Sequence, residues 1–579
     1  MRKVLLTLIA ALITSSPASA ACQLGKLLEL KVTMQGTQPF TDVGINGRFL
    51  PFIVDSGAFF SAMSVGTAQE LSLPLSYTPL RMAGIGGEAG TVYVARVKSL
   101  DLAGVPLHDM EFLVGGSETG SGGLLGQNIL GIGDVEYDLG HGAIRLMRPA
   151  GCSANDNLAY WAGQAPVSDL EIDSRNIRHP HTIGTVLVNG MKVRAIFDTG
   201  AGSSILSLSA AKRIGLTPSS PGVVSSGAIR GLGRSMIETW LAPVDSVKVG
   251  TEEVRNIKLR IGDIANVEAD MLIGADFFLS HRVYVANALR KIYFTYDGGP
   301  VFDATPSRIV DEEGAPRTLG ADDSPQPTDA AGFSRRGAAE TSRRDYKAAL
   351  ADLDRAVAME PRNGKYLLQR ARAQVLAGNR SAAFADLDQA VNVAPTDPEI
   401  RLARAESFLG RKRTSDALYD LEAADGALPS QADERLAIAI QLERLDQFER
   451  AITDYNMWIA THPDDSRHSF ALNGRCWTRA LAGRDLPLAL KDCDAALEIV
   501  KAGSYLGSRG LVNLRLGKFD RAIADFNAAL KLAPNDAWSL YGRGLARRHK
   551  NDPKAQNDLD AAAVIDPALP PRAKSLGLN

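Results

Sequence analysis

The chain has 579 residues, which is too long for one domain and predicts three or four. Its apolar content of 45% and charged content of 22% are those of ordinary globular proteins. The formal net charge of -2 excludes a strongly basic chain, so it gives no indication of nucleic acid or an anionic membrane as a partner.

The stretch 1–20 has the pattern of a secretory signal. Arg2 and Lys3 supply the positive start, Val4–Ile13 is apolar, and Ala18, Ser19 and Ala20 form a small-residue cleavage site. The apolar part is too short to span a bilayer and no later stretch is long enough, so we expect no membrane span. We therefore expect an exported protein in the bacterial periplasm, with secretion or a lipid anchor on Cys22 as alternatives.

The chain has four cysteines, and their spacing does not suit a zinc site because none forms a CxxC pair. An oxidising compartment favours disulfides. Cys22 and Cys152 bracket the first β-rich region, whereas Cys476 and Cys493 lie within one later repeat. We hypothesise one disulfide within each pair, with buried free thiols as the alternative.

Residues 21–150 predict an all-β lobe, because short apolar runs alternate with Gly and Pro. The expected strands are Leu28–Val32, Phe49–Val54, Thr91–Val97, Leu100–Leu102 and Ile144–Met147. One short helix is expected at Ser64–Leu71, ending near Pro74.

After a connection at 151–181, residues 182–302 predict a second lobe with the same plan. Expected strands are Thr185–Val188, Lys192–Phe197, Thr239–Leu241, Val247–Val249, Ile257–Ile261 and Ile292–Tyr296, with a helix at Ser207–Ile214. The interval from Asp55 to Asp198 is almost the same as the interval from Gly126 to Gly274. Such a nearly constant offset indicates an internal duplication.

Residues 303–335 predict a linker, because the stretch is polar, has few apolar residues to bury and shows no strand pattern after Pro306. From 336 to 579 the apolar period becomes helical. An alanine recurs at a nearly regular interval: Ala349, Ala383, Ala417, Ala451, Ala489, Ala522 and Ala555. A core-type residue follows each alanine by four positions, which places both on one helix face.

This interval resembles that of the tetratricopeptide repeat, a helical hairpin of about 34 residues. The best copy has Gly510, Gly517, Ala522, Phe526, Ala529 and Pro534. The resemblance implies an all-α solenoid whose concave face binds a protein partner. The alternative is that the array only packs against the β-rich lobes or against another copy of the chain.

Two tetrapeptides, Asp55-Ser56-Gly57-Ala58 and Asp198-Thr199-Gly200-Ala201, each follow an apolar run that predicts a strand. An Asp in such a turn can face a cleft, and two of them can activate water. With the elements that follow, each half resembles a retropepsin-type lobe of the aspartic peptidases. Those elements are the flap-like Gly84-Ile85-Gly86-Gly87 and Gly231-Leu232-Gly233, and the aliphatic-glycine elements Leu124-Leu125-Gly126 and Leu272-Ile273-Gly274.

The resemblance implies that Asp55 and Asp198 form a catalytic dyad that shares one proton and needs no metal or cofactor. Because the titration belongs to the pair, the acid and the base are not assigned to particular residues. The hydroxyls of Ser56 and Thr199 would bond across the lobe interface, while Gly57 and Gly200 permit tight turns. Leu125 and Ile273, each followed by the glycine Gly126 or Gly274, would pack behind the loops, and the flap glycines would allow closure over a peptide.

These expectations describe an exported aspartic endopeptidase whose helical array recruits a peptide or protein substrate, or a partner protein. The alternative is a non-proteolytic scaffold that binds extended peptide with a protease-like fold. Both halves lie in one chain, so the dyad would need no dimer, and neither flap has the Tyr of pepsin-like enzymes. His179 and His181 have no third ligand spaced to join them, so the sequence favours a solvated loop there over a metal site.

Overall fold

The structure is a computed structural model. It describes residues 22–78, 80, 82–88, 92–115, 122–173, 181–233, 236–264, 269–303, 308–315, 326–463, 465 and 467–578. The predicted signal segment therefore lies outside the described residues. Within them, no helix combines the length and the apolar character needed to cross a membrane.

Lobe 1 is a β-sheet lobe with small helices. Its sheet has the order β2 (Thr33–Gln35), β3 (Gln38–Ile45), β4 (Arg48–Val54), β11 (Gly123–Leu125), β5 (Ala62–Met63), β10 (Val105–Val114), β9 (Tyr93–Leu102) and β6 (Leu75–Tyr77). It also has α1 (Val65–Glu70), the hairpin β7 (Ala83–Gly84) and β8 (Gly87–Glu88), α2 (Gln127–Leu130) and the 3₁₀ turn η1 (Leu139–His141). Ser64 begins α1 by accepting a hydrogen bond from the Thr67 amide at 2.8 Å.

Lobe 2 repeats this plan. Its sheet has the order β18 (Val224–Ile229), β19 (Ile237–Val249), β15 (Ile183–Val188), β16 (Met191–Phe197), β21 (Met271–Ile273), β17 (Ile205–Ser207), β20 (Glu252–Gly262) and β24 (Ile309–Val310). Its helices are α3 (Leu208–Arg213) and α4 (Ala275–Phe278). Ser207 caps α3 through the Ala210 amide at 3.1 Å, and it is the equivalent of Ser64, which caps α1.

A third sheet joins the two lobes. Its order is β1 (Gln23–Lys31), β13 (Ala143–Ala150), β12 (Asp134–Asp138), β22 (His281–Ala286), β23 (Lys291–Tyr296) and β14 (Ser168–Glu171). Lobe 1 supplies β12 and lobe 2 supplies β22, and the two strands pair antiparallel. Glu136 stands opposite Tyr284 in this pairing, so the approximate twofold axis that relates the lobes passes between these two residues.

Buried ion pairs cross this junction. The Glu136 carboxylate, which is fully buried, accepts hydrogen bonds from Arg145 of lobe 1 at 2.6 Å and from Arg282 of lobe 2 at 2.8 Å. Asp138 also pairs with Arg145, at 3.0 Å. Although burial alone would raise its pKa, these arginines and His141 hold the pKa of Asp138 well below its ordinary value. This network therefore holds the two lobes together, and each buried carboxylate in it is paired with an arginine.

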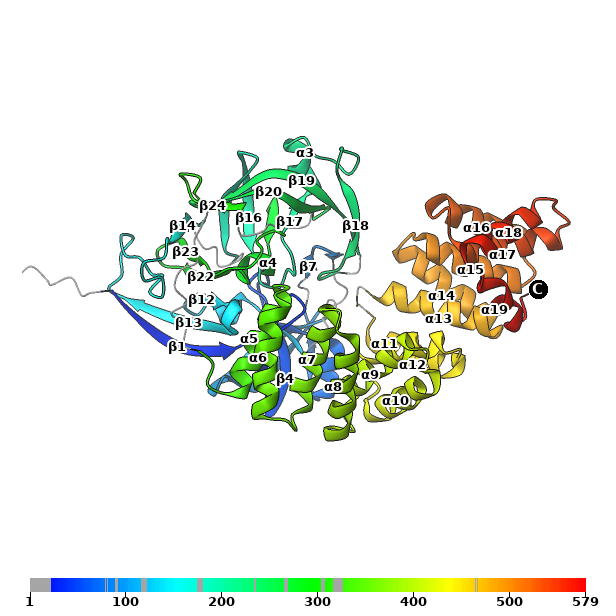
Figure 1. The fold of residues 1–579 in the computed structure, drawn as a ribbon, viewed down its shortest axis with the longest axis horizontal. Coiled ribbons are helices and arrows are strands. Elements are labelled where there is room, and N and C mark those ends of the chain that lie inside the picture. Colours follow the sequence, from blue (N-terminus) through cyan, green and yellow to red (C-terminus); the bar gives the residue numbers. More distant parts are fainter. Residues whose placement is uncertain are drawn as a thin grey trace, which may run out of the picture.

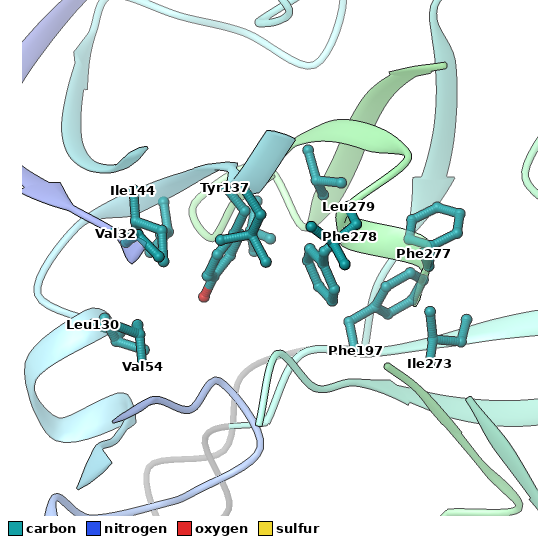
Figure 2. Packing of buried hydrophobic residues seen from close by; sticks show 14 of the residues in the cluster. Val32, Val54, Leu130, Tyr137, Ile144, Phe197, Ile273, Phe277, Phe278 and Leu279 are labelled. Atoms are coloured by element: carbon teal, nitrogen blue, oxygen red, sulfur yellow. The ribbon is translucent and has the colours of Figure 1, made fainter. Parts of the chain in front are cut away.

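One apolar core extends through both lobes. Val54, Leu130 and Tyr137 of lobe 1 and Phe197, Ile273 and Phe277–Leu279 of lobe 2 belong to the same buried cluster (Figure 2). Tyr137 meets Phe278 edge to face, with ring centroids 5.2 Å apart. The loops that carry the predicted catalytic residues thus lie on a continuous packed base.

The helical region forms the predicted array of antiparallel hairpins. Its helices are α5 (Ala330–Ser342), α6 (Tyr346–Met359), α7 (Gly364–Leu376), α8 (Arg380–Val393), α9 (Pro398–Gly410), α10 (Thr414–Ala427), α11 (Arg435–Arg444), α12 (Phe448–Thr461), α13 (His468–Ala482), α14 (Leu486–Ile499), α15 (Gly503–Arg515), α16 (Phe519–Leu532), α17 (Ala537–His549), α18 (Ala555–Ile565) and α19 (Leu569–Ser575). The recurring alanines lie on the second helix of each hairpin and are buried. The predicted fold class, two all-β lobes followed by an all-α solenoid, is confirmed.

A repeated arginine–aspartate pair stiffens the array and was not predicted. Arg370 on α7 donates to Asp386 on α8 at 2.7 Å and also to Asp354 on the preceding hairpin at 2.8 Å. Arg404 repeats both contacts one hairpin later, with Asp420 at 2.7 Å and Asp388 at 3.0 Å. The same arginine therefore connects the helices of its own hairpin and ties that hairpin to its predecessor.

The array begins against the lobes. Ala338 and Ala339 of α5 belong to the core that the two lobes share. The Ser342 hydroxyl donates to the Gly36 carbonyl of lobe 1, and Arg343 Nε donates to the Leu279 carbonyl of lobe 2 at 2.6 Å. Figure 1 shows α5–α8 beside the lobes, with α13–α19 extending to the right.

Some elements differ from the predicted boundaries. Inside the stretch predicted as a linker, β24 pairs with β20 and α5 begins at Ala330, so this stretch contributes to both folded regions. The predicted inter-lobe connection contains β14, which forms an edge of the joining sheet. These strands are short and gain their stability from pairing with distant segments, which local sequence does not reveal.

The four cysteines form two disulfides. Cys22 is bonded to Cys152, and Cys476 is bonded to Cys493.

Candidate active site

Asp55 and Asp198 occupy equivalent positions at the ends of central strands. Asp55 follows β4, which pairs in parallel with β11, and its amide donates to the Leu125 carbonyl at 3.0 Å. Asp198 follows β16, which pairs with β21, and its amide donates to the Ile273 carbonyl at 2.8 Å. The aliphatic residue of each aliphatic-glycine element thus holds the backbone of the corresponding Asp.

The glycine of each aliphatic-glycine element admits the active-site loop. A Cβ atom on Gly126 would come within 2.9 Å of the Ala58 carbonyl oxygen, and one on Gly274 within 2.6 Å of the Ala201 carbonyl oxygen. Leu125 and Ile273 are fully buried behind these loops. A larger residue in place of either glycine would displace the loop that carries the Asp.

Reciprocal hydrogen bonds join the two active-site loops. The Ser56 amide donates to Thr199 Oγ1 at 3.0 Å, and the Thr199 amide donates to Ser56 Oγ at 2.9 Å. The two hydroxyls donate in turn to the carbonyls that precede the opposite Asp, Ser56 to Phe197 at 2.9 Å and Thr199 to Val54 at 2.7 Å. Each lobe therefore fixes the other's loop.

The two carboxyl groups face each other across this interface. A Cβ atom on Gly57 would lie 2.3 Å from Asp198 Cγ, and one on Gly200 would lie 2.4 Å from Asp55 Cγ. Glycine is therefore required at both positions, because any side chain would occupy the place of the opposite carboxylate. Each glycine amide also donates to the Asp of its own lobe, at 2.9 Å in both cases.

The protonation of the pair follows from this proximity. Burial, repulsion from Asp198 and a hydrogen bond with it raise the pKa of Asp55 well above its ordinary value. Burial also raises the pKa of Asp198, although the hydrogen bond with Asp55, the Gly200 amide and nearby His181 oppose that rise. Two carboxyls in this arrangement share a proton, because ionising both would place like charges side by side.

The two glycine-rich hairpins meet above the cleft. The Gly86 amide donates to the Leu232 carbonyl at 2.9 Å. A Cβ atom on Gly231 would lie 2.2 Å from Ile85, one on Gly84 would lie 2.8 Å from Leu232, and Gly233 has a φ of 116°. The glycines therefore allow the two hairpins to touch.

A large cleft lies between the flaps and the carboxyls. Its volume is about 1460 Å³, and its lining includes Asp55, Asp198, Ile85, Leu232 and His181. This volume exceeds the roughly 300–1,000 Å³ of typical small-molecule pockets. The cleft has room for a polypeptide segment.

His181 belongs to the site, so its assignment to a solvated loop is wrong. Its Nε2 atom lies 2.7 Å from the Gly57 carbonyl oxygen and donates to it, because a carbonyl only accepts. The imidazole packs against Phe59, with ring centroids 4.0 Å apart. The interval that separates Asp55 from Asp198 also separates Gln38 of lobe 1 from His181, so the two residues are equivalent. This shared interval is the one signal in the sequence that places His181 near Asp55 and Asp198. His179 lies outside the described residues.

Two further residues were missed. Asn128 Oδ1 accepts from the Ser61 amide at 2.7 Å, and Asp276 Oδ1 accepts from the Ser204 amide at 2.9 Å. They are equivalent in the two lobes, since each follows its aliphatic-glycine element by two positions. Burial raises the pKa of Asp276 to about 6, while its hydrogen bonds with Ser204 oppose the rise.

The remaining predicted residues, the four cysteines, lie apart from this cleft. The Cys22–Cys152 disulfide belongs to the joining sheet, beside β1 and β13, and Cys476–Cys493 connects α13 to α14. Neither disulfide lines the cleft. Both therefore support the fold and take no part in the chemistry of the site.

Comparison with protein families assigns each region. The aspartyl protease family matches residues 184–277, and the gag-polyprotein aspartyl protease family matches residues 41–131. The tetratricopeptide repeat family matches residues 504–536. No curated protein sequence matches the chain significantly.

Three solved structures resemble parts of the chain at low sequence identity. A chain of the Cut9–Hcn1 hetero-tetramer of the APC/C is 18% identical, with a TM-score of 0.32. The match covers 42% of this chain and 48% of the Cut9–Hcn1 chain, so it spans about half the length of that chain. A tetratricopeptide repeat protein from Parabacteroides merdae is 16% identical with a TM-score of 0.34, over 43% and 98% of the two chains. The type IV pilus biogenesis factor PilW is 15% identical with a TM-score of 0.31, over 37% and 97%. With a family model matched in each lobe and in one of the helical hairpins, the chain combines two tandem aspartyl-protease-like lobes with a tetratricopeptide-like array.

Proposed function

We propose that the chain is an exported aspartic endopeptidase in which water held between Asp55 and Asp198 attacks a peptide bond. The observation that carries this proposal is the mutual approach of the two carboxyls, each against the glycine of the opposite lobe. The reciprocal Ser56 and Thr199 bonds support it, because they hold both loops in the same relative position before substrate binds.

The proposed reaction needs one proton on the pair. The ionised carboxylate takes a proton from water, and the protonated carboxyl donates its proton to the carbonyl oxygen as the hydroxide adds to carbon. The resulting gem-diol then collapses as the protonated carboxyl gives its proton to the leaving nitrogen and the ionised carboxyl takes one from a hydroxyl of the intermediate, which breaks the C–N bond and restores the single shared proton. Because the two carboxyls titrate as a pair, the shared proton belongs to the dyad, and the charge of His181 favours the ionised form of Asp198.

Export is the second part of the proposal. The stretch 1–20 has the composition of a secretory signal, and two disulfides suit an oxidising compartment such as the periplasm. Fractionation of the native host, with detection of the processed protein outside the cytoplasm, tests this part directly.

Replacing either Asp tests the chemistry. Purified protein carrying Asp55→Asn or Asp198→Asn should cleave unfolded β-casein at least about 10³-fold more slowly than the wild type, since acid–base groups contribute about 10²–10⁴. Asp245→Asn, at an exposed residue of lobe 2, is the matched control and should retain activity. Cleavage that survives in either dyad variant would exclude the assignment. A wild type that binds β-casein and never cleaves it would instead indicate the peptide-binding scaffold.

A further inference from the structure

The cleft has a third wall, which the helical array supplies. Besides the two lobes, its lining includes Ser342 at the end of α5, Leu436 and Ile440 of α11, and Phe470 of α13. Asp433, Glu434, Ala437 and Arg467 complete this helical wall. The hollow that contains the dyad is therefore continuous with the surface of the array.

The wall is tied together beneath the flap of lobe 2. Arg467 Nη1 donates to Asp433 at 3.0 Å, and Arg467 Nη2 donates to Asp465 at 2.7 Å. The bond to Asp433 connects the segment before α13 to the start of α11, and the bond to Asp465 orients Arg467 within its own segment. Flap residue Arg230 lies close enough to interact electrostatically with Asp433, Asp465 and Arg467. Arg230 and Arg467 both line the cleft, so the flap of lobe 2 and the array face the same hollow.

Exposed apolar side chains from all three regions gather in this cleft. Phe60 and Leu80 come from lobe 1, Met236 from lobe 2 and Phe470 from α13, and each is between 43% and 52% exposed. A single exposed apolar residue needs no explanation, but several around one hollow form an interaction patch. Apolar side chains of a ligand would bury area against each of them.

The helical wall also has an acidic position. Glu434 interacts electrostatically with Asp433, Glu399 and Glu70, all of which repel its charge. Asp433 is neutralised by Arg467, Glu399 by Arg372 at 2.9 Å and Glu70 by Arg48, whereas the described residues include no ion pair for Glu434. A basic group in the cleft would relieve this repulsion.

We propose that the array forms part of the substrate groove. An extended polypeptide bound at the dyad continues along α11 and the start of α13, where an apolar side chain packs on Phe470 and a basic side chain pairs with Glu434. The inference rests on the proposed function for the identity of the ligand as a substrate. The array thereby selects long, unfolded segments and does not act only as a remote tether.

Binding to a catalytically disabled protein tests the groove separately from cleavage. Short overlapping β-casein peptides, each just long enough to fill the cleft between the lobes, are screened for binding to the full chain carrying Asp55→Asn. The tightest binder is then doubled in length at its amino or its carboxyl end, with one Phe and one Lys in the extension. Fluorescence anisotropy should show that one lengthened peptide binds at least about tenfold tighter than the short peptide, as burial of a half-exposed Phe predicts.

The array variants identify the contact. Adding Phe470→Ala to the Asp55→Asn protein should reduce the advantage of the long peptide to within about threefold, whereas Leu532→Ala, at an exposed residue of α16 outside the cleft, should leave it intact. Glu434→Gln should lower the preference for Lys over Glu in the extension. Urea unfolding of each variant verifies that its fold is retained.

Two results would overturn the proposal. Equal binding of long and short peptides would show that the groove ends at the lobes, and an undiminished advantage in the Phe470→Ala protein would place the contact elsewhere. Sedimentation that reveals a dimer dissociated by Phe470→Ala would show a second copy as the occupant and would also reject it. Because the assay uses the Asp55→Asn protein, a wild type that lacks protease activity leaves this result valid.

Discussion

The two lobes are alike in backbone and apolar packing but differ in the polar residues around the dyad. Both have the same parallel strand pair beneath the Asp, the same hydroxyl bonds and the same glycine against the opposite carboxyl. His181 of lobe 2 stands where lobe 1 has Gln38, and Asp276 stands where lobe 1 has Asn128. The scaffold therefore places the two carboxyls symmetrically, and the surrounding polar groups make them chemically unequal.

The largest expected effect concerns the charges that cross the joining sheet. Glu136→Gln removes the negative charge that Arg145 and Arg282 share in a buried site. We expect the free energy of unfolding to fall by about 3–5 kcal/mol, because both arginines lose their common partner. Urea unfolding measures the loss. Glu29→Gln removes a more exposed partner of Arg145 and should cost no more than about 1 kcal/mol. Equal losses would show that the junction does not depend on this buried charge.

Removing either hydroxyl of the reciprocal hydrogen bonds, Ser56 or Thr199, should reduce stability and activity by a similar amount. Thr199→Val leaves the Ser56 amide and the Val54 carbonyl without partners, and Ser56→Ala does the same to the Thr199 amide and the Phe197 carbonyl. Each change should lower the free energy of unfolding by about 2–4 kcal/mol and reduce cleavage of β-casein. Thr199→Ser keeps the hydroxyl, so this variant should retain most of the stability and most of the cleavage activity. If only one of the two variants, Ser56→Ala or Thr199→Val, lost stability and activity, the result would contradict the reciprocal arrangement.

Asp276 predicts a pH dependence that its equivalent in lobe 1, Asn128, cannot contribute. Its pKa is about 6 in the folded protein, above the ordinary value of 3.8, so the folded state holds the proton more tightly and stability decreases as pH rises from about 4 to about 6. Asp276→Asn should remove this decrease and add up to about 3 kcal/mol at pH 7, because an amide oxygen accepts the same bonds in lobe 1.

The converse change, Asn128→Asp, is the matched control for that prediction. It introduces a second buried carboxyl and should create the same downward slope of stability with pH. Thermal unfolding between pH 4 and pH 8 measures both variants. If the stability of the wild type did not change between pH 4 and pH 8, ionisation of Asp276 would not destabilise the folded protein.

The smallest expected effect concerns His181. His181→Gln gives lobe 2 the residue of lobe 1 and removes an imidazole whose charge lowers the pKa of Asp198. The acid limb of kcat/KM should therefore move to higher pH, because the ionised form of Asp198 loses support. The loss of one hydrogen bond to Gly57 should reduce activity by no more than about tenfold. A purely structural role would lower activity without moving the acid limb.

The amino-acid sequence predicted the features that repeat. Two copies of the Asp turn, the flap and the aliphatic-glycine element, at nearly constant offset, predicted that Asp55 and Asp198 lie at equivalent positions, and the structure brings them together. The recurring alanines similarly located the second helix of every hairpin. Duplication helps in both cases, because a weak local signal gains weight when it recurs at the same interval.

The features that were missed depend on contacts between distant segments. In the joining sheet, the pairings of β1 with β13, β12 with β22 and β14 with β23 connect segments far apart in the sequence, so local propensity does not set them. His181 enters the site because lobe 2 packs against Gly57 of lobe 1. The approach of α11 and α13 to the cleft depends on how the array docks through α5.

The pairing of Glu136 with Tyr284 at the approximate axis restricts how the lobes can associate as separate fragments. If lobe 1 paired with a copy of itself in this register, Glu136 would stand opposite another Glu136, and each would keep its own Arg145 but lack Arg282. Like charges directly opposite in a sheet oppose pairing. Fragments made by cutting the chain between the lobes would therefore complement each other in preference to forming homodimers. The difference between Glu136 and Tyr284 at equivalent positions thus favours pairing of one lobe with the other.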